Sequence, residues 1–247
     1  MFRLGSQGRQ ALARIDRSWK ATEHVLVTGG TGSGKTVLAY YLDMMRVNHG
    51  GHVVNFVAKI APDETITDLY RDWTRWESWP RRAPTAFENK ILLWPKVEGL
   101  PIAQARHLLA VTFADALDTI TAKGKWTVHI DEGLFMSLPY DRRSRRGAGL
   151  GLGDTLATMS ALYRSSGGTL ITLSQRPSHL PLALYANASH SFIARASESA
   201  DLKRLAELGG RQSARELQKE IANNGDHDFL WVPTGHGTIA ERLNLAK

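Results

Sequence analysis

The residues most suited to chemistry form a glycine-rich loop that follows a short apolar run. The loop reads GGTGSGKT over residues 29–36 and fits the pattern G-x-x-x-x-G-K-[ST]. Its backbone N–H groups can surround a polyphosphate, and the start of the following helix adds a positive dipole. Lys35 can neutralise the β- and γ-phosphates, and the Thr36 hydroxyl can ligate Mg²⁺. The predicted nucleotide-binding residues are Gly29, Gly30, Thr31, Gly32, Ser33, Gly34, Lys35 and Thr36.

Two adjacent carboxylates, Asp131 and Glu132, end a second apolar run, WTVHI over residues 126–130. We expect Asp131 to lie beside Thr36, where it can hold Mg²⁺ directly or through water. Glu132 would then face the γ-phosphate as the base that orients and deprotonates the attacking water. The alternative is a strand that merely ends in charged residues, which the phosphate-binding loop makes the weaker interpretation. Because the sequence has no guanine-reading N-K-x-D stretch, ATP is the favoured nucleotide.

A third polar side chain, Gln175, follows the apolar run TLITLS at residues 169–174. At the tip of a strand it can sense the γ-phosphate and hold the attacking water, although a simple polar residue between strand and loop is the alternative. The order of the three motifs predicts an ATPase in which an additional strand separates the strand before the loop from the strand with the carboxylates.

The patterns between these motifs predict alternating strands and helices. Strands are expected at residues 24–28, 52–58, 91–94, 126–130, 169–174 and 191–194. Helices are expected at residues 1–22, 34–48, 63–78, 101–121, 154–165, 197–208 (capped by Ser197) and 213–222, and a hairpin at 227–232 and 238–243. The fold class is therefore α/β: a three-layer P-loop NTPase of the ASCE or RecA-like type, with a mainly parallel central sheet, helices on both faces and a C-terminal β-hairpin. Residues 1–22 are expected to form a helical segment and residues 23–247 one ATPase domain.

The composition is that of a globular chain. It has 247 residues, 43% of them hydrophobic, and a formal net charge of +7, which permits an acidic partner without establishing one. Disulfides and thiolate metal sites are excluded because the sequence contains no cysteine. Since no stretch approaches the ~18 consecutive apolar residues of a membrane span, we expect a cytoplasmic protein without a membrane partner.

Several short segments resemble the FtsK–HerA superfamily of DNA-pumping ATPases. Residues 170–177 (LITLSQRP) are similar to its sensor segment, and residues 191–197 (SFIARAS) to its arginine-bearing strand. Further matches are Ala186-Asn187-Ala188, Asp201 and Leu208-Gly209-Gly210. The resemblance covers roughly residues 24–235. With no membrane anchor, long linker or winged-helix domain expected, the chain is most similar to the small viral DNA-packaging ATPases of that superfamily.

The resemblance implies a homo-oligomeric ring of five or six copies with ATP at the subunit interfaces. Such a site needs an arginine from the neighbouring subunit, whose loss can cost ~10³–10⁵ in rate. Arg164, just before the sensor strand, is the first candidate for this arginine finger, Arg195 the second and the cluster at 142–146 the third. Each arginine has the alternative of a solvated surface charge.

A basic loop after the carboxylates is the candidate contact with DNA. Arginine side chains on such a loop can grip phosphates without reading bases, although a merely solvated loop is the alternative. Its arginines are Arg142, Arg143, Arg145 and Arg146, and weaker candidates are Lys59, Arg81 and Arg82. Trp73, Trp76 and Trp79 could stack on bases, but packing in a core or subunit contact is the favoured interpretation.

Together these features predict an ATP hydrolase that translocates double-stranded DNA, as a subunit of a viral genome-packaging motor in the host cytoplasm, with a portal or capsid protein as a further partner. A plasmid or mobile-element DNA-transfer ATPase is the first alternative. A phage-assembly ATPase that moves protein rather than DNA is the second.

Overall fold

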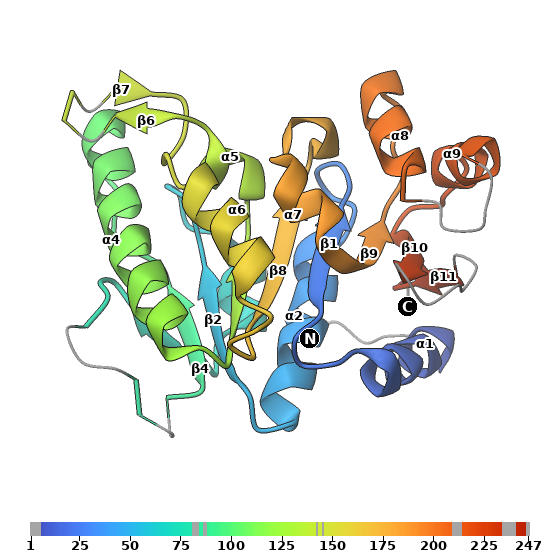
Figure 1. Ribbon diagram of the computed structural model, residues 1–247, viewed down its shortest axis with the longest axis horizontal. Helices are drawn as coiled ribbons and strands as arrows, with labels where there is room; N and C mark the ends of the chain where they lie inside the picture. The colour runs from blue at the N-terminus through green and yellow to red at the C-terminus, as the bar shows by residue number, and fades with distance from the viewer. Residues whose placement is uncertain are drawn as a thin grey trace.

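A central β-sheet forms the body of the protein in the computed structural model (Figure 1). The structure describes residues 6–80, 84–85, 88–141, 143–144, 146–208, 214–233 and 241–245. Nine strands of these segments form one sheet in the order β11-β10-β9-β1-β8-β5-β2-β4-β3. In chain order they are β1 (His24–Thr28), β2 (His52–Phe56), β3 (Thr74–Trp76), β4 (Lys90–Leu93), β5 (Trp126–Ile130), β8 (Thr169–Ser174), β9 (Ala188–Ile193), β10 (Asp228–Pro233) and β11 (Glu241–Asn244).

The central strands are parallel, and the C-terminal strands are not. β1 pairs in parallel with both β8 and β9, and β5 pairs in parallel with β8 and β2. Every residue of β1, β5 and β8 is buried, as expected for parallel strands covered on both faces. β10 is antiparallel to β9 and to β11. The mainly parallel α/β sheet, the strand between β1 and β5, and the antiparallel C-terminal pair are thus all confirmed.

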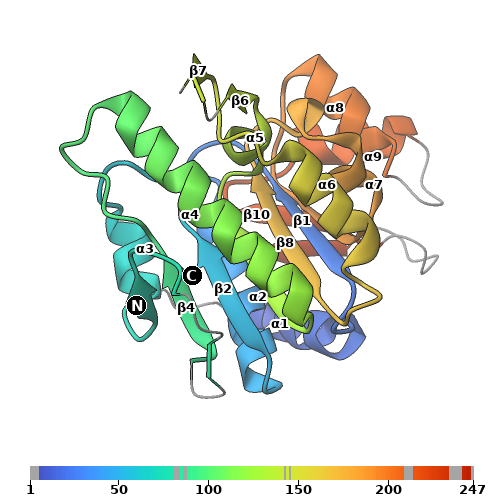
Figure 2. The ribbon, with the colours of Figure 1, turned by 60° about the vertical axis from the view of Figure 1, so that its left-hand side comes forward.

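Helices cover both faces of the sheet (Figure 2). They are α1 (Ser6–Ser18), α2 (Lys35–Asn48), α3 (Glu64–Leu69), α4 (Ile102–Lys123), α5 (Gly133–Ser137), α6 (Gly153–Leu162), η1 (Pro177–His179), α7 (Leu182–Ala186), α8 (Ser199–Ala206) and α9 (Ala214–Ala222). α4 and α6 pack on one face through a core that includes Val128 and Leu170. α1 and α2 pack on the other through a core that includes Val25 and Ile171. The alternation of side chains along each strand supplies both cores.

The predicted helix over residues 63–78 is wrong. α3 ends at Leu69, and β3 then adds a parallel strand to the edge of the sheet beside β4. Asp63 does begin the helix, because its side chain accepts a hydrogen bond from the Ile66 N–H at 3.0 Å. The aromatic residues that follow favour a strand. Trp73 is buried at 7% exposure and lies 4.8 Å from Tyr70 between ring centroids, so the packing interpretation is confirmed for Trp73.

Smaller differences concern element ends and one loop. α8 begins after Glu198 and has no side-chain cap, so the prediction that Ser197 caps it is wrong. The basic loop expected after the carboxylates contains a short antiparallel ribbon of β6 (Tyr140–Asp141) and β7 (Arg146–Gly147). The expected glycine pair at 209–210 lies outside the described residues, as do Arg81, Arg82, Arg142 and Arg145.

Candidate nucleotide-binding site

The glycine-rich loop joins the end of β1 to the start of α2. Gly34 stands at the N-cap of α2 with φ 92°, a left-handed conformation that glycine adopts without strain. Gly29 has no room for a side chain, since a Cβ there would lie 2.6 Å from the Ala194 Cβ and 2.7 Å from the Ser33 Oγ. These two glycines let the loop turn tightly against β9 and present the N-terminus of α2, an arrangement that can bind an anion.

The Lys35 ammonium folds back over this loop. Its Nζ donates hydrogen bonds to the carbonyl oxygens of Gly29 at 2.7 Å and Gly30 at 2.8 Å. Burial lowers the pKa of Lys35, while the nearby carboxylates of Glu132 and Asp131 act in the opposite direction. A cation is therefore held at the mouth of the loop, beside the backbone that would surround a polyphosphate.

The carboxylates Asp131 and Glu132 follow β5, at the same edge of the sheet as the loop. Burial raises the pKa of both groups, and the Asp131 charge raises that of Glu132 further. Lys59, His129 and Lys35 partly offset the rise for Asp131. The Glu132 Oε1 is buried and finds no hydrogen-bond partner among the described residues. This oxygen can therefore bind a molecule from outside the protein.

Gln175 connects the tip of β8 to the loop. Its Oε1 accepts a hydrogen bond from the Thr31 hydroxyl at 3.1 Å. The loop is also held by the Gly29 N–H, which donates to the Ser174 carbonyl at 3.2 Å. Because β8 lies between β1 and β5, Gln175 stands between the loop and the two carboxylates along the sheet edge.

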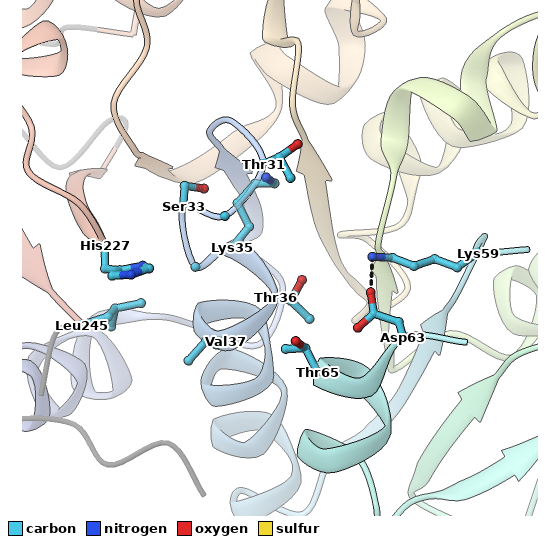
Figure 3. Close-up of a pocket in the computed structure, with 12 residues that line it drawn as sticks. Thr31, Ser33, Lys35, Thr36, Val37, Lys59, Asp63, Thr65, His227 and Leu245 are labelled. Carbon is cyan, nitrogen blue, oxygen red and sulfur yellow. Dashed lines mark hydrogen bonds and ion pairs between the residues drawn. The ribbon is translucent and has the colours of Figure 1, made fainter. Parts of the chain in front are cut away.

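A pocket of about 630 Å³ opens around the N-terminus of α2 (Figure 3). The predicted residues Thr31 to Thr36 line it. Sequence reasoning missed the rest of its lining, which comprises Val37, Asp63, Thr65, His227 and Leu245, and treated Lys59 only as a weak DNA contact. Val37 directly follows the motif, whereas no local motif marks Asp63, Thr65, His227 and Leu245, since they come from segments distant from the loop in the sequence.

Lys59 and Asp63 form an ion pair on one side of this pocket, with 2.6 Å between Nζ and Oδ2. Burial lowers the pKa of Lys59, but the hydrogen bond to Asp63 and the charges of Asp131 and Glu132 outweigh it, so the net change is upward. Lys59 is thus a second cation close to the carboxylates that end β5.

The arginine candidates lie in three places. Arg195 is exposed after β9 and lines hollows beside Gly29 and Gly30. Arg164 is exposed between α6 and β8, at the opposite edge of the sheet. There it contributes, after burial, to lowering the pKa of His24 at the start of β1 to about 4. Arg143 and Arg146 are exposed on the β6–β7 ribbon near the start of α4 (Figure 1).

The residues present fit a magnesium nucleotide. The Glu132 Oε1 and the Ser33 hydroxyl oxygen are buried without a hydrogen-bond partner in the described segments, and both belong to the predicted site. Within the described residues no group of three or more His, Cys, Asp or Glu side chains could hold a metal ion unaided. A Mg²⁺ ion held by Thr36 and Asp131 would therefore need phosphate oxygens and water to complete its shell, which is how Mg²⁺ is commonly bound.

The same fold occurs in a viral genome-packaging NTPase, in a conjugation coupling protein and in VirB4. The chain is similar to the genome-packaging NTPase B204 from Sulfolobus turreted icosahedral virus 2 in complex with AMPPCP, with a TM-score of 0.56, 13% identity, and 91% of this chain and 98% of that chain covered. VirB4 of Thermoanaerobacter pseudethanolicus gives a TM-score of 0.61, 14% identity, and 91% and 89% coverage. The pCW3 conjugation coupling protein TcpA gives a TM-score of 0.54 and 16% identity, and the match covers 92% of this chain and 60% of that chain.

These likenesses establish a P-loop ATPase-like fold, and they agree with the resemblance to the FtsK–HerA superfamily. No family model and no curated protein matches the sequence. Within the described part of the chain, no helix combines the length and apolar character that a membrane crossing requires.

Proposed function

We propose that this protein is an ATP hydrolase that works as a DNA translocase. The observation that carries the proposal is the meeting of three motifs at one edge of the sheet: the Lys35 loop, the half-buried Glu132 and the Gln175 tip. A likeness of fold to a genome-packaging NTPase and to a conjugation coupling protein supports it.

Each residue has a role in this proposal. The loop amides and Lys35 bind the β- and γ-phosphates, and Thr36 and Asp131 hold Mg²⁺, which supplies charge neutralisation when bound. Glu132 accepts a proton from the attacking water through Oε1, the oxygen that no described residue hydrogen-bonds. Gln175, already bonded to Thr31, links the γ-phosphate position to the loop.

We also propose a division of the chain and a ring assembly. Residues 23–247 form the motor domain, and the N-terminal segment packs on it through Leu12 and Ile15 of α1 and through Trp19, which follows that helix. A homo-oligomeric ring would place double-stranded DNA against Arg143 and Arg146 on the β6–β7 ribbon, with Arg164 or Arg195 serving as the finger of a neighbour. A viral packaging motor in the host cytoplasm, docked on a portal or capsid protein, is the favoured setting.

A plasmid or mobile-element DNA-transfer ATPase is the second candidate, and the likeness to a conjugation coupling protein and to VirB4 favours it. Both candidates move DNA. An assembly ATPase that moves protein would differ in its response to nucleic acid.

The test of ATP hydrolysis is Glu132→Gln. We expect MgATP binding to persist and turnover to fall about 10²–10⁴-fold, the usual contribution of a positioned general base. Glu98→Gln is the matched control, because Glu98 is exposed in the segment between β4 and α4. This variant should hydrolyse ATP like the wild type. Normal turnover by Glu132→Gln would show that the base assignment is wrong.

The test of translocation is the effect of duplex DNA on the ATPase rate at low salt, where phosphate contacts are strongest. Stimulation that disappears when Arg143 and Arg146 are both changed to Ala would support the DNA motor. An ATPase rate that duplex DNA does not change at low salt would favour the protein-moving alternative.

A further inference from the structure

The pocket around the N-terminus of α2 has two chemically different ends (Figure 3). Lys59 and Asp63 stand at one end, where Lys59 also acts on the pKa of Asp131 and Glu132. His227 and Leu245 stand at the other end, with Val37 of α2 between them and the charged residues. One end is therefore charged and close to the carboxylates after β5, and the other is aromatic and aliphatic.

This asymmetry fixes the direction of a bound nucleotide. The γ-phosphate must lie towards Glu132 and Gln175 if water is to attack it there. The chain of phosphates then runs along the loop away from β5, and the base emerges towards β10 and β11, on the far side of β1. His227 and Leu245 belong to exactly that part of the sheet edge, since they flank the start of β10 and the end of β11.

His227 is held in an unusual conformation beside the loop. Its φ is 62°, in the left-handed region that residues other than glycine rarely adopt. The Leu245 N–H donates to the His227 carbonyl at 3.1 Å, which ties the two residues together. A Cβ on Gly34 would lie 3.3 Å from the His227 Nδ1, so the imidazole borders the loop directly, and the residue is nevertheless exposed.

Leu245 supplies an apolar surface next to this ring. It is 9% exposed and packs in the same core as Phe229, and its Cδ1 lies 3.9 Å from the position of a Cβ on Gly34. A flat imidazole beside aliphatic side chains matches a planar heteroaromatic ring, which binds by stacking and apolar contact.

We infer that His227 and Leu245 form the base-binding end of the nucleotide site, with the purine ring stacked on the His227 imidazole and bordered by Leu245 and Val37. The inference rests on the proposed function, because it assumes that a nucleoside triphosphate occupies the loop. It assigns to the C-terminal strands a direct contact with the substrate, which no motif in the sequence indicates.

The test compares MgATP with inorganic tripolyphosphate, which has the phosphates but no base. Affinities of the full chain for both are measured by calorimetry or by competition. His227→Ala should weaken MgATP binding roughly 5- to 150-fold, the range expected when one stacked base loses its partner, and should leave tripolyphosphate binding unchanged. His227→Phe, which keeps a flat ring, should bind MgATP within a few-fold of the wild type.

His179→Ala is the matched control, because His179 is also exposed and lies outside the pocket. It should bind both ligands normally. An equal loss of both ligands in His227→Ala, or no loss of either, would overturn the inference. A wild-type protein that binds tripolyphosphate as tightly as MgATP would also overturn it while leaving phosphate binding intact. A wild-type protein that binds neither ligand would overturn the proposed function, and the base site with it.

Discussion

A buried polar cluster joins the helix after the loop to the strand that carries the carboxylates. The Tyr70 hydroxyl donates to the Asp43 Oδ2 at 2.7 Å, and the His129 Nδ1 lies 2.7 Å from the same oxygen. All three residues are at most 2% exposed. Asp43 lies on α2 and His129 on β5, two residues before Asp131. We predict that Tyr70→Phe lowers the thermal stability of the protein.

The size of the effect follows from the contacts. The substitution keeps the ring, which packs edge-on against Tyr40 and Trp73, and removes only the hydroxyl. A hydrogen bond to a charged group contributes about 1.5–3 kcal/mol. For a chain of this size each kcal/mol shifts Tm by roughly 2–4 °C, so we expect a fall of about 3–12 °C. Because Asp43 keeps His129 as a partner, the lower half of that range is favoured.

Thermal unfolding followed by circular dichroism measures this fall. The matched control is Tyr163→Phe, because the Tyr163 hydroxyl is also buried but makes no hydrogen bond of normal geometry within the described part of the chain. It should change stability by no more than about 0.5 kcal/mol, well below the cost of breaking a hydrogen bond to a charged group. Equal Tm values for Tyr70→Phe and the wild type would refute the reasoning that this bond stabilises the fold.

Two further predictions concern protonation and loop geometry. The pKa of His24 falls from 6.5 to about 4 on folding, through burial and then Arg164, so the unfolded chain binds the proton first and stability is lost as pH falls through this window. Between pH 7 and pH 5 the protonation of His24 should lower the free energy of unfolding of the wild type by about 2 kcal/mol. Urea unfolding at the two pH values should show that this decrease is absent in His24→Asn. Gly34→Ala forces a side chain to φ 92° and should weaken MgATP binding about 5- to 30-fold, from about 1–2 kcal/mol of strain. Gly30→Ala, where a Cβ meets nothing within 4 Å, should lose clearly less, and equal losses in the two variants would show that strain is not the cause.

The central strands and their motifs could be predicted because their signals are local. Residues 24–28, 126–130 and 169–174 are continuous apolar runs bounded by polar residues or glycine, and the structure reproduces these ranges exactly. A parallel strand covered on both faces is mostly apolar along its whole length, and the short runs rich in β-branched residues favour a strand over a helix. The order of the motifs then placed β8 between β1 and β5.

The missed features depend on contacts between distant segments. The helix expected through residue 78 stops at Leu69 because β3 gains a partner in β4, about fifteen residues later in the chain. His227 and Leu245 reach the loop only because β10 and β11 extend the sheet beyond β9. The Asp43–His129 contact spans 86 residues and is invisible to any local pattern.

The two leading candidates for the arginine finger, Arg164 and Arg195, lie at opposite edges of the sheet because one precedes a parallel strand and the other follows one. Residues after β1, β5, β8 and β9 all lie at one edge, so Arg195 stands beside the loop of its own subunit. Arg164 precedes β8 and lies at the other edge, beside His24, out of reach of its own loop. Arg195 could therefore serve a nucleotide in its own subunit or one across an interface, whereas Arg164 could act only across an interface. A finger role for Arg164 thus requires neighbouring subunits to place opposite edges of their sheets together, whereas a finger role for Arg195 requires them to bring their nucleotide edges close to each other.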